Sequence, residues 1–250
     1  MALKDILKEK YGINATVFDE IDSTNTAAKR AAAGGAEQWS VFIAKKQSAG
    51  RGRLGRDFYS PDGGLYMSIL LRPSFSPENN LLITTAAAAA VHEALKKVFG
   101  KVAKIKWVND ILADGKKLCG ILAETALLGD RPAYTVLGIG VNLFGDESSV
   151  PENLKSIMGF VQKDAVSEAE KADFIGEILE NFKKYYVNLS AKPHLGYYKE
   201  NMLSDISVSV LKGDDCYPAV ITGIDDEFHL LAEGAHGSEK LSFGEVRICL

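Results

Sequence analysis

A run of ten residues in the first quarter of the chain, residues 47–56, combines glycine with arginine. Three of each are interleaved there: Gly50, Arg51, Gly52, Arg53, Gly55 and Arg56. Glycine lets a backbone adopt angles closed to other residues and approach a ligand closely. Arginine supplies a permanently charged fork that fits carboxylate and phosphate. Because strand-like runs flank it (residues 41–44 and 65–71), we predict a loop between two strands that clamps a small anion.

Two other roles are open for such a loop, a solvated basic surface or a contact with nucleic acid. Nucleic-acid binding needs a wider basic face. This chain of 250 residues has 29 Lys and Arg against 33 Asp and Glu, a net charge of −4. The arginines are therefore a local concentration in an acidic protein, and we expect a small anionic ligand and no nucleic-acid partner.

The composition, 46% hydrophobic and 25% charged, is that of a soluble globular protein. The length allows one well-buried core plus a smaller module. The first residues lack the apolar core of a signal peptide, and no run approaches the roughly 18 apolar residues of a membrane span. Three widely spaced cysteines form no CxxC pair and suggest no disulfide framework. We therefore expect a cytoplasmic protein that does not associate with membranes.

The order of the predicted elements indicates an α+β fold with a mixed or antiparallel sheet flanked by helices. A long helix is expected from Pro77 and Glu78 to Phe99, and tight turns join the strands between residues 104 and 143. From residue 206, short alternating runs separated by Gly-Asp turns predict a small β-barrel that must lean on its neighbour for stability. The predicted domains are residues 1–204 and residues 205–250.

Polar residues also precede the alanine-rich segment 27–33, where Ser23, Thr24 and Asn25 follow the first predicted strand. These residue types favour helix N-caps, so capping is one explanation. The other is that hydroxyl and amide groups at a positive helix N-terminus bind a polar ring or a carbonyl. Both explanations can hold at once.

A third polar segment follows the predicted strand at residues 104–108. Asn109 and Asp110 leave this strand and can hold a divalent cation through oxygen ligands, although an Asn-Asp pair is also a common turn. Lys117 comes seven residues later, after a tight turn, and can return to the same pocket. Together with the arginine-glycine loop, these residues suit a reaction between a carboxylate and a polyphosphate, in which two anions must be neutralised.

Four segments together resemble the motifs of the biotin protein ligases, in the order and spacing of that family. They are Ser23-Thr24-Asn25, Gln47 with residues 50–56, residues 106–110 and residues 117–122. Family members often read KWPND where this chain has Val108 in place of the proline. The resemblance covers nearly the whole chain. It implies the class II aminoacyl-tRNA synthetase/biotin synthetase-like fold with a C-terminal SH3-like β-barrel, in the short form without an N-terminal DNA-binding domain.

The resemblance also implies roles for individual residues. The biotin-binding residues would be Ser23, Thr24, Asn25, Gln47, Gly50, Arg51, Gly52, Arg53 and Lys117. The ATP-binding residues would be Arg51, Arg53, Arg56, Phe58, Asn109, Lys117 and Asn142, with Asn109 and Asn142 as metal ligands. In catalysis, Arg53 and Lys117 would act at the carboxylate–phosphate junction, and Asp110 would orient or deprotonate the incoming lysine amine.

The implied reaction uses biotin, ATP and Mg²⁺ to form biotinyl-5′-AMP, and then transfers biotin to a lysine of a biotin carboxyl carrier protein. A homodimer is expected from the resemblance. Two alternatives remain open. A lipoate protein ligase or octanoyl transferase shares the fold, but its substrate has no ureido ring to occupy Ser23, Thr24 and Gln47. A non-catalytic biotin-sensing regulator is the other alternative.

Overall fold

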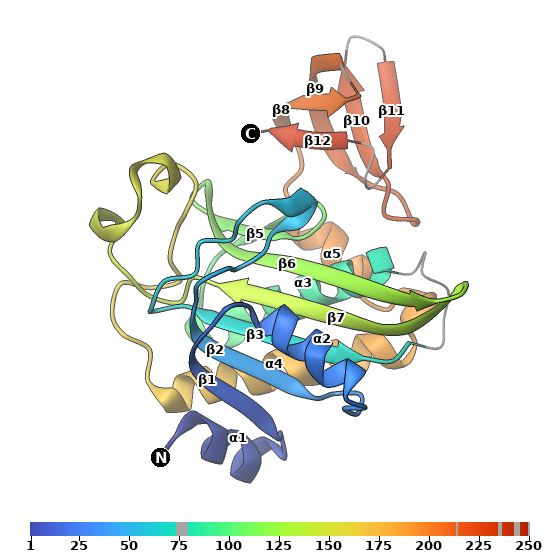
Figure 1. Ribbon diagram of the computed structural model, residues 1–250. Helices are drawn as coiled ribbons and strands as arrows, with labels where there is room; N and C mark the ends of the chain where they lie inside the picture. Colours follow the sequence, from blue (N-terminus) through green and yellow to red (C-terminus); the bar gives the residue numbers. More distant parts are fainter. Residues whose placement is uncertain (74–79, 214, 235–236, 243–245, 250) are drawn as a thin grey trace.

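The computed structural model describes residues 1–73, 80–213, 215–234, 237–242 and 246–249. Within these residues a seven-stranded sheet forms the centre of the molecule (Figure 1), in the order β1-β2-β3-β7-β6-β5-β4. Its strands are β1 (Ala15–Ile21), β2 (Val41–Gln47), β3 (Leu65–Leu71), β4 (Lys104–Lys106), β5 (Asp110–Ala113), β6 (Lys116–Leu128) and β7 (Arg131–Val141). β1 and β2 are parallel and the remaining neighbours are antiparallel. The predicted mixed sheet is confirmed.

Helices cover both faces of this sheet (Figure 1). They are α1 (Leu3–Tyr11), α2 (Thr24–Ala33), α3 (Asn80–Phe99), α4 (Glu168–Val187) and α5 (Leu195–Asn201). The main core joins α3 and α4 to one face, while α2 packs in a smaller cluster on the opposite face. Residues 86–90 of α3 are all alanine and fully buried, so this helix approaches the sheet closely. The predicted start of α3 at Pro77 and Glu78 lies outside the described residues.

Ser167 is predicted from the sequence to cap a helix with apolar residues at 174, 178, 182 and 185, and the N-terminus of α4 forms as predicted. Ser167 and Glu170 form a reciprocal capping box at its N-terminus, and Phe174, Ile178 and Phe182 of its apolar stripe are buried. In the part of the chain that the structure describes, no helix is both long and apolar enough to cross a membrane.

A second, antiparallel sheet is formed by strands that lie between residues 206 and 249. Across its described residues it has the order β11-β10-β9-β8-β12. The strands are β8 (Ile206–Lys212), β9 (Asp215–Ile224), β10 (Leu230–Gly234), β11 (Gly237–Leu241) and β12 (Val246–Cys249). Alternating runs at residues 208–211, 217–223, 228–232 and 246–250 predict four of these strands. The pattern misses β11, which contains a single large apolar side chain, Leu241. The predicted fold class is confirmed, and the boundary between residues 204 and 205 stays a prediction.

This small sheet contacts α5 and the β4–β5 connection of the larger unit through the turn between β9 and β10. Phe228 in that turn is fully buried, and its ring stacks on His194 at 5.0 Å between centroids. The Phe228 carbonyl accepts a hydrogen bond of 2.9 Å from Trp107 Nε1. Lys192 and Lys199 hold the same turn through ion pairs with Glu227 and Asp226.

Candidate active site

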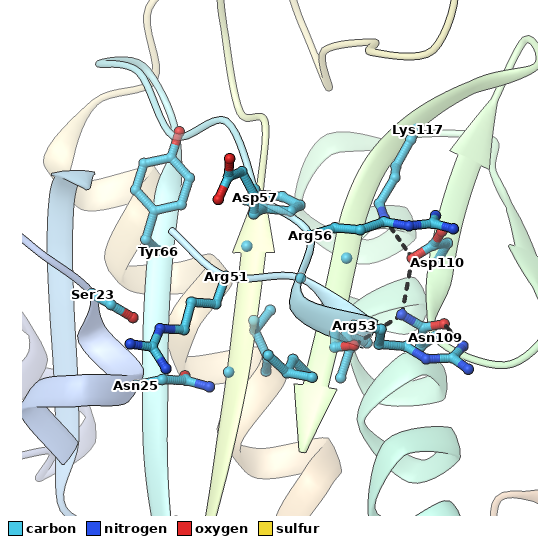
Figure 2. A pocket seen from close by; sticks show the side chains of 18 of the residues that line it. Ser23, Asn25, Arg51, Arg53, Arg56, Asp57, Tyr66, Asn109, Asp110 and Lys117 are labelled. Carbon is cyan, nitrogen blue, oxygen red and sulfur yellow. Dashed lines mark hydrogen bonds and ion pairs between the residues drawn. The ribbon is translucent and has the colours of Figure 1, made fainter. Parts of the chain in front are cut away.

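A cavity of about 220 Å³ opens on the face of the sheet that carries α2. Figure 2 shows Ser23, Asn25 and Arg51 on one side of it and Asn109, Asp110 and Lys117 on the other. The predicted site residues in its lining are Ser23, Thr24, Asn25, Gln47, Arg51, Gly52, Arg53, Arg56, Phe58, Asn109, Asp110 and Lys117. Among the described residues, Gly50 and Asn142 are the predicted ones outside the lining. The fold thus brings three distant sequence segments to one cavity.

Three glycines form the floor of the cavity. Gly120 of β6 pairs with Gly140 of β7, and Gly138 lies two residues earlier on the same face. A Cβ atom on Gly140 would lie 2.6 Å from a ring carbon of Phe58, and one on Gly138 would lie 2.3 Å from Asn25 Oδ1. Real Cβ atoms do not approach that closely, so glycine at these positions lets the two side chains rest directly on the sheet.

The wall beside α2 presents hydroxyl and amide groups, next to the guanidinium of Arg51 (Figure 2). The backbone N–H of Thr24 donates to Gln47 Oε1 at 2.8 Å, and Thr24 Oγ1 lies 3.2 Å from the same oxygen. Gln47 Nε2 donates to Ser60 Oγ at 2.9 Å. Ser23 is the N-cap residue, but within the described residues its side chain makes no capping hydrogen bond. Gln47 therefore satisfies a donor at the start of α2, and this leaves the Ser23 and Thr24 side chains to line the cavity.

The opposite wall is charged. Arg53 Nη1 donates to Asn109 Oδ1 at 2.8 Å, and Lys117 Nζ pairs with Asp110 Oδ1 at 2.7 Å. Asn109 Nδ2 donates to the same Asp110 oxygen at 3.1 Å, which links the two cations in one chain (Figure 2). Lys117 Nζ also lies 5.7 Å from the centre of the Phe58 ring. Burial lowers the pKa of the Arg53 guanidinium, and the Asp110 carboxylate opposes that shift.

The arginine-glycine loop closes on itself above the cavity. The N–H of Gly52 donates to the Arg56 carbonyl at 2.7 Å, and the N–H of Phe58 donates to the Gly50 carbonyl at 2.9 Å. A Cβ atom on Gly50 would lie 2.4 Å from the Phe58 carbonyl oxygen, so this glycine is needed for loop closure. Leu54 at the tip of the loop is 76% exposed and has a positive φ of 57°.

The comparisons with known proteins agree with this geometry. Residues 17–142 match the model of the biotin/lipoate A/B protein ligase family. The chain belongs to this family. It is 32% identical to the bifunctional ligase/repressor BirA of Bacillus subtilis, over 96% of this chain and 75% of that protein. It is 28% identical to the biotin–[acetyl-CoA-carboxylase] ligase of Mycobacterium tuberculosis, over 92% of this chain and 87% of that protein.

A solved structure gives the same result. The biotin protein ligase from Aquifex aeolicus, in complex with biotin and ATP, superposes with a TM-score of 0.78 at 29% identity. The match covers 94% of this chain and 97% of that chain. The resemblance that the four sequence motifs indicate is confirmed, and so is the fold that it implies.

The magnesium ligands Asn109 and Asn142 stay a prediction. Asn109 lines the cavity, and its Oδ1 accepts from Arg53 Nη1 at 2.8 Å. Asn142 lies outside the lining, and its Nδ2 donates to the carbonyls of Lys117 and Gly159 at 3.1 Å each. Its buried Oδ1 has no hydrogen-bond partner in the part of the chain that the structure describes. Asn142 thus holds the Lys117 backbone through its Nδ2.

Sequence reasoning misses several residues that shape the site. They are the floor glycines Gly120, Gly138 and Gly140, the hydroxyl residues Ser60 and Ser68, and Glu124. The alternation of glycine in β7 is a visible signal, but its meaning depends on the register with β6. The serines and Glu124 carry no local signal at all.

Proposed function

We propose that this chain is a biotin protein ligase. It activates biotin with ATP to biotinyl-5′-AMP and transfers the biotinyl group to a lysine of a biotin carboxyl carrier protein. The observation that carries the proposal is one cavity with a hydrogen-bonding wall of hydroxyl and amide groups at one side and an Arg53–Asn109–Asp110–Lys117 chain at the other. Biotin has a polar ring at one end and a carboxylate at the other, which matches this division.

In this proposal the ring of biotin lies against the wall formed by Ser23, Thr24 and Gln47. A ureido ring offers both N–H donors and a carbonyl acceptor, so it needs partners of both kinds. Hydroxyl and amide groups supply both in a confined space. Arg51 lines the same side of the cavity (Figure 2) and contributes to the slot. Gly52 is part of the lining as well. Asn25 lines the cavity where its side chain rests on Gly138 of the floor.

The first step joins two anions. A carboxylate oxygen of biotin attacks the α-phosphorus of ATP, the new O–P bond forms, and pyrophosphate leaves with the bonding electron pair. Arg53 from the loop and Lys117 from β6 neutralise the carboxylate and the α-phosphate as they approach. Arg56, Phe58 and Asn109 complete the nucleotide side of the site. The protein contributes alignment and charge, and it forms no covalent intermediate of its own.

The second step transfers the acyl group. The ε-amine of the acceptor lysine attacks the carbonyl carbon of the mixed anhydride, an amide forms, AMP leaves, and a proton passes from the amine to a base. Asp110 fits this role, but it is paired with Lys117 in this structure. When Lys117 turns to the bound adenylate, Asp110 loses this partner and becomes available to the incoming amine. The loop over the cavity protects the anhydride from water meanwhile.

The deciding experiment measures pyrophosphate release from Mg-ATP by the purified protein, with biotin or lipoate as the acid. Release with biotin alone supports the proposal, and addition of an apo biotin carrier domain should then produce a biotinylated lysine. Release with lipoate alone would reassign the chain to the lipoate branch of its family. No release from folded protein that binds biotin would instead support a biotin-sensing role.

We also propose that residues 1–204 form the catalytic unit and residues 205–250 the SH3-like module. The protein is expected to act as a cytoplasmic homodimer without a nucleic-acid partner. The net charge of −4 supports the last point. Sedimentation equilibrium and a DNA mobility shift at low salt, each with and without biotin, test the two expectations.

A further inference from the structure

Glu124 of β6 lies beside the polar wall without lining the cavity, and the proposed reaction does not use it. Lys29 of α2 pairs with its Oε1 atom at 2.6 Å, with side-chain exposures of 32% for Lys29 and 26% for Glu124. Asn25 Nδ2 donates to its Oε2 atom at 2.7 Å. The half-buried carboxylate of Glu124 thus accepts a hydrogen bond from Asn25, which lines the cavity.

A chain of hydrogen bonds continues from Asn25 to the cavity wall. Ser68 Oγ lies 2.6 Å from Asn25 Oδ1 and 2.8 Å from Thr24 Oγ1. Thr24 Oγ1 lies 3.2 Å from Gln47 Oε1. Ser68 is fully buried and Thr24 is 3% exposed, so bulk water does not supply alternative partners for this segment.

The donor and acceptor inventory fixes the direction of this chain. An ionised carboxylate is an acceptor only, so Asn25 must turn its Nδ2 to Glu124 and its Oδ1 to Ser68. The single hydroxyl proton of Ser68 is then committed to Asn25. The Ser68 and Thr24 oxygens lie 2.8 Å apart and need one proton between them. Because Ser68 has no second proton to donate, Thr24 supplies it and Ser68 accepts. Each proton in the chain points toward Glu124.

The other end of the wall is fixed in the same way. Ser60 Oγ donates to the Phe58 carbonyl at 2.8 Å, so it can only accept from Gln47. Gln47 must therefore present Nε2 to Ser60 and Oε1 to Thr24. As a result, the Thr24 oxygen and Gln47 Oε1 keep lone pairs for a ligand, and both act as acceptors.

We propose that Glu124, held by Lys29, is a positioning residue that fixes the direction of this chain and makes the wall select a ligand ring for its N–H groups. The proposal rests on the proposed function, since the ureido ring of biotin carries two N–H groups. The floor supports it, because Gly138 lets Asn25 reach both Glu124 and Ser68. Burial disfavours ionisation of Glu124, but hydrogen bonds from Lys29 and Asn25 outweigh this, and the pKa of Glu124 is lowered overall.

The test compares two ligands of the same shape. One is biotin, and the other is its cyclic-carbonate analogue, in which an oxygen replaces each ring N–H. Calorimetry gives the Kd of each for the parent and for Glu124→Gln, whose carboxamide donates as well as accepts and no longer imposes a direction. Glu177→Gln is the matched control, because Glu177 pairs with Lys97 at 2.6 Å far from the cavity, between α3 and α4.

The parent and the control should prefer biotin by about tenfold or more, the value of one or two neutral hydrogen bonds. Glu124→Gln should lose most of this preference through weaker biotin binding, with carbonate binding unchanged. If it weakens both ligands equally, or if the parent binds biotin without preferring it, the inference is overturned. A parent that does not bind biotin would instead defeat the proposed function.

A second variant keeps the test decisive if Glu124→Gln does not give a cooperative thermal unfolding transition. In Glu124→Ala, water takes the place of the carboxylate, and water both donates and accepts. This variant should show the same loss of preference, and a preference equal to that of the parent overturns the inference.

Discussion

Two neighbouring lysines of β6 offer a controlled test of the charged wall. Lys117 faces the cavity and pairs with Asp110 at 2.7 Å, whereas Lys116 pairs with Glu147 at 2.6 Å outside it. Their side chains are 27% and 29% exposed. Replacing each with methionine removes one charge and one ion pair at nearly equal burial. The two variants therefore differ mainly in whether the lost cation faces the proposed reacting groups.

The magnitude follows from the contacts. Loss of either ion pair, Lys117–Asp110 or Lys116–Glu147, should lower the free energy of unfolding by about 1 kcal/mol or less. In the reaction, Lys117 contributes a charge-assisted hydrogen bond worth about 1.5–3 kcal/mol, which corresponds to about one to two decades in rate. Lys117→Met should thus slow adenylate formation about 10- to 100-fold, and Lys116→Met should leave it near the parent rate.

Single-turnover release of pyrophosphate at saturating biotin and Mg-ATP measures this rate, and urea titrations measure the stability of both variants. Biotin affinity in the absence of ATP is measured separately, because Lys117 also faces the carboxylate of biotin while the ring-binding wall is untouched. If Lys117→Met forms adenylate as fast as the parent, Lys117 does not act on the reacting groups. Equal losses in the two variants would instead trace the effect to β6 as a whole.

Three further outcomes are expected. Arg53→Ala should retain biotin binding but release adenylate into solution, measured as biotinyl-AMP in a filtrate; retention equal to that of the parent contradicts the role. Gly138→Ala should weaken biotin binding at least tenfold, because its Cβ would displace Asn25. An unchanged Kd would contradict the role of Gly138 as the support of Asn25. Burial lowers the pKa of His194 to about 4, below the unfolded value of about 6.5. As the pH falls through this interval the unfolded chain binds the proton first, so the free energy of unfolding should drop by about 3 kcal/mol. Denaturant titrations of the parent should show this slope, and His194→Gln should lack most of it.

The sequence predicts local features of the fold well. The run at residues 65–71 corresponds to β3 (Leu65–Leu71), because an apolar segment interrupted only by Ser68, between Gly-Gly and Pro, leaves few alternatives. The capping residues at Ser167 likewise place the start of α4. β11 is not predicted from the sequence, because its Gly-Ser-Glu-Lys-Leu segment is mostly polar. It is a strand because it pairs with β10.

The candidate site likewise contains residues that local sequence predicts and residues that only the folded sheet reveals. The arginines, Asn109 and Lys117 are recognisable in sequence because their chemistry and spacing are distinctive. The floor is not, because Gly138-Ile139-Gly140 resembles the start of a dinucleotide fingerprint but lacks its last glycine and following helix. The pairing of Gly140 with Gly120 gives the segment its meaning, and that register is a property of the folded sheet.

The small C-terminal sheet is coupled to the charged wall through the backbone. Trp107 donates to the Phe228 carbonyl from the segment that leads into Asn109, and the hydroxyl of Tyr198 in α5 donates to the Val108 carbonyl at 3.2 Å. Both contacts are buried and both act on the two residues before Asn109. Phe228 of the β9–β10 turn therefore helps to hold the segment that leads into Asn109, directly through Trp107 and indirectly through its ring contact with Tyr198. Asn109 is also held from β6, because the N–H of Ile121 donates to its carbonyl and its Nδ2 donates to the Ile121 carbonyl, at 2.9 Å each. The position of the charged wall thus depends on β6 together with a C-terminal module from which no described side chain lines the cavity.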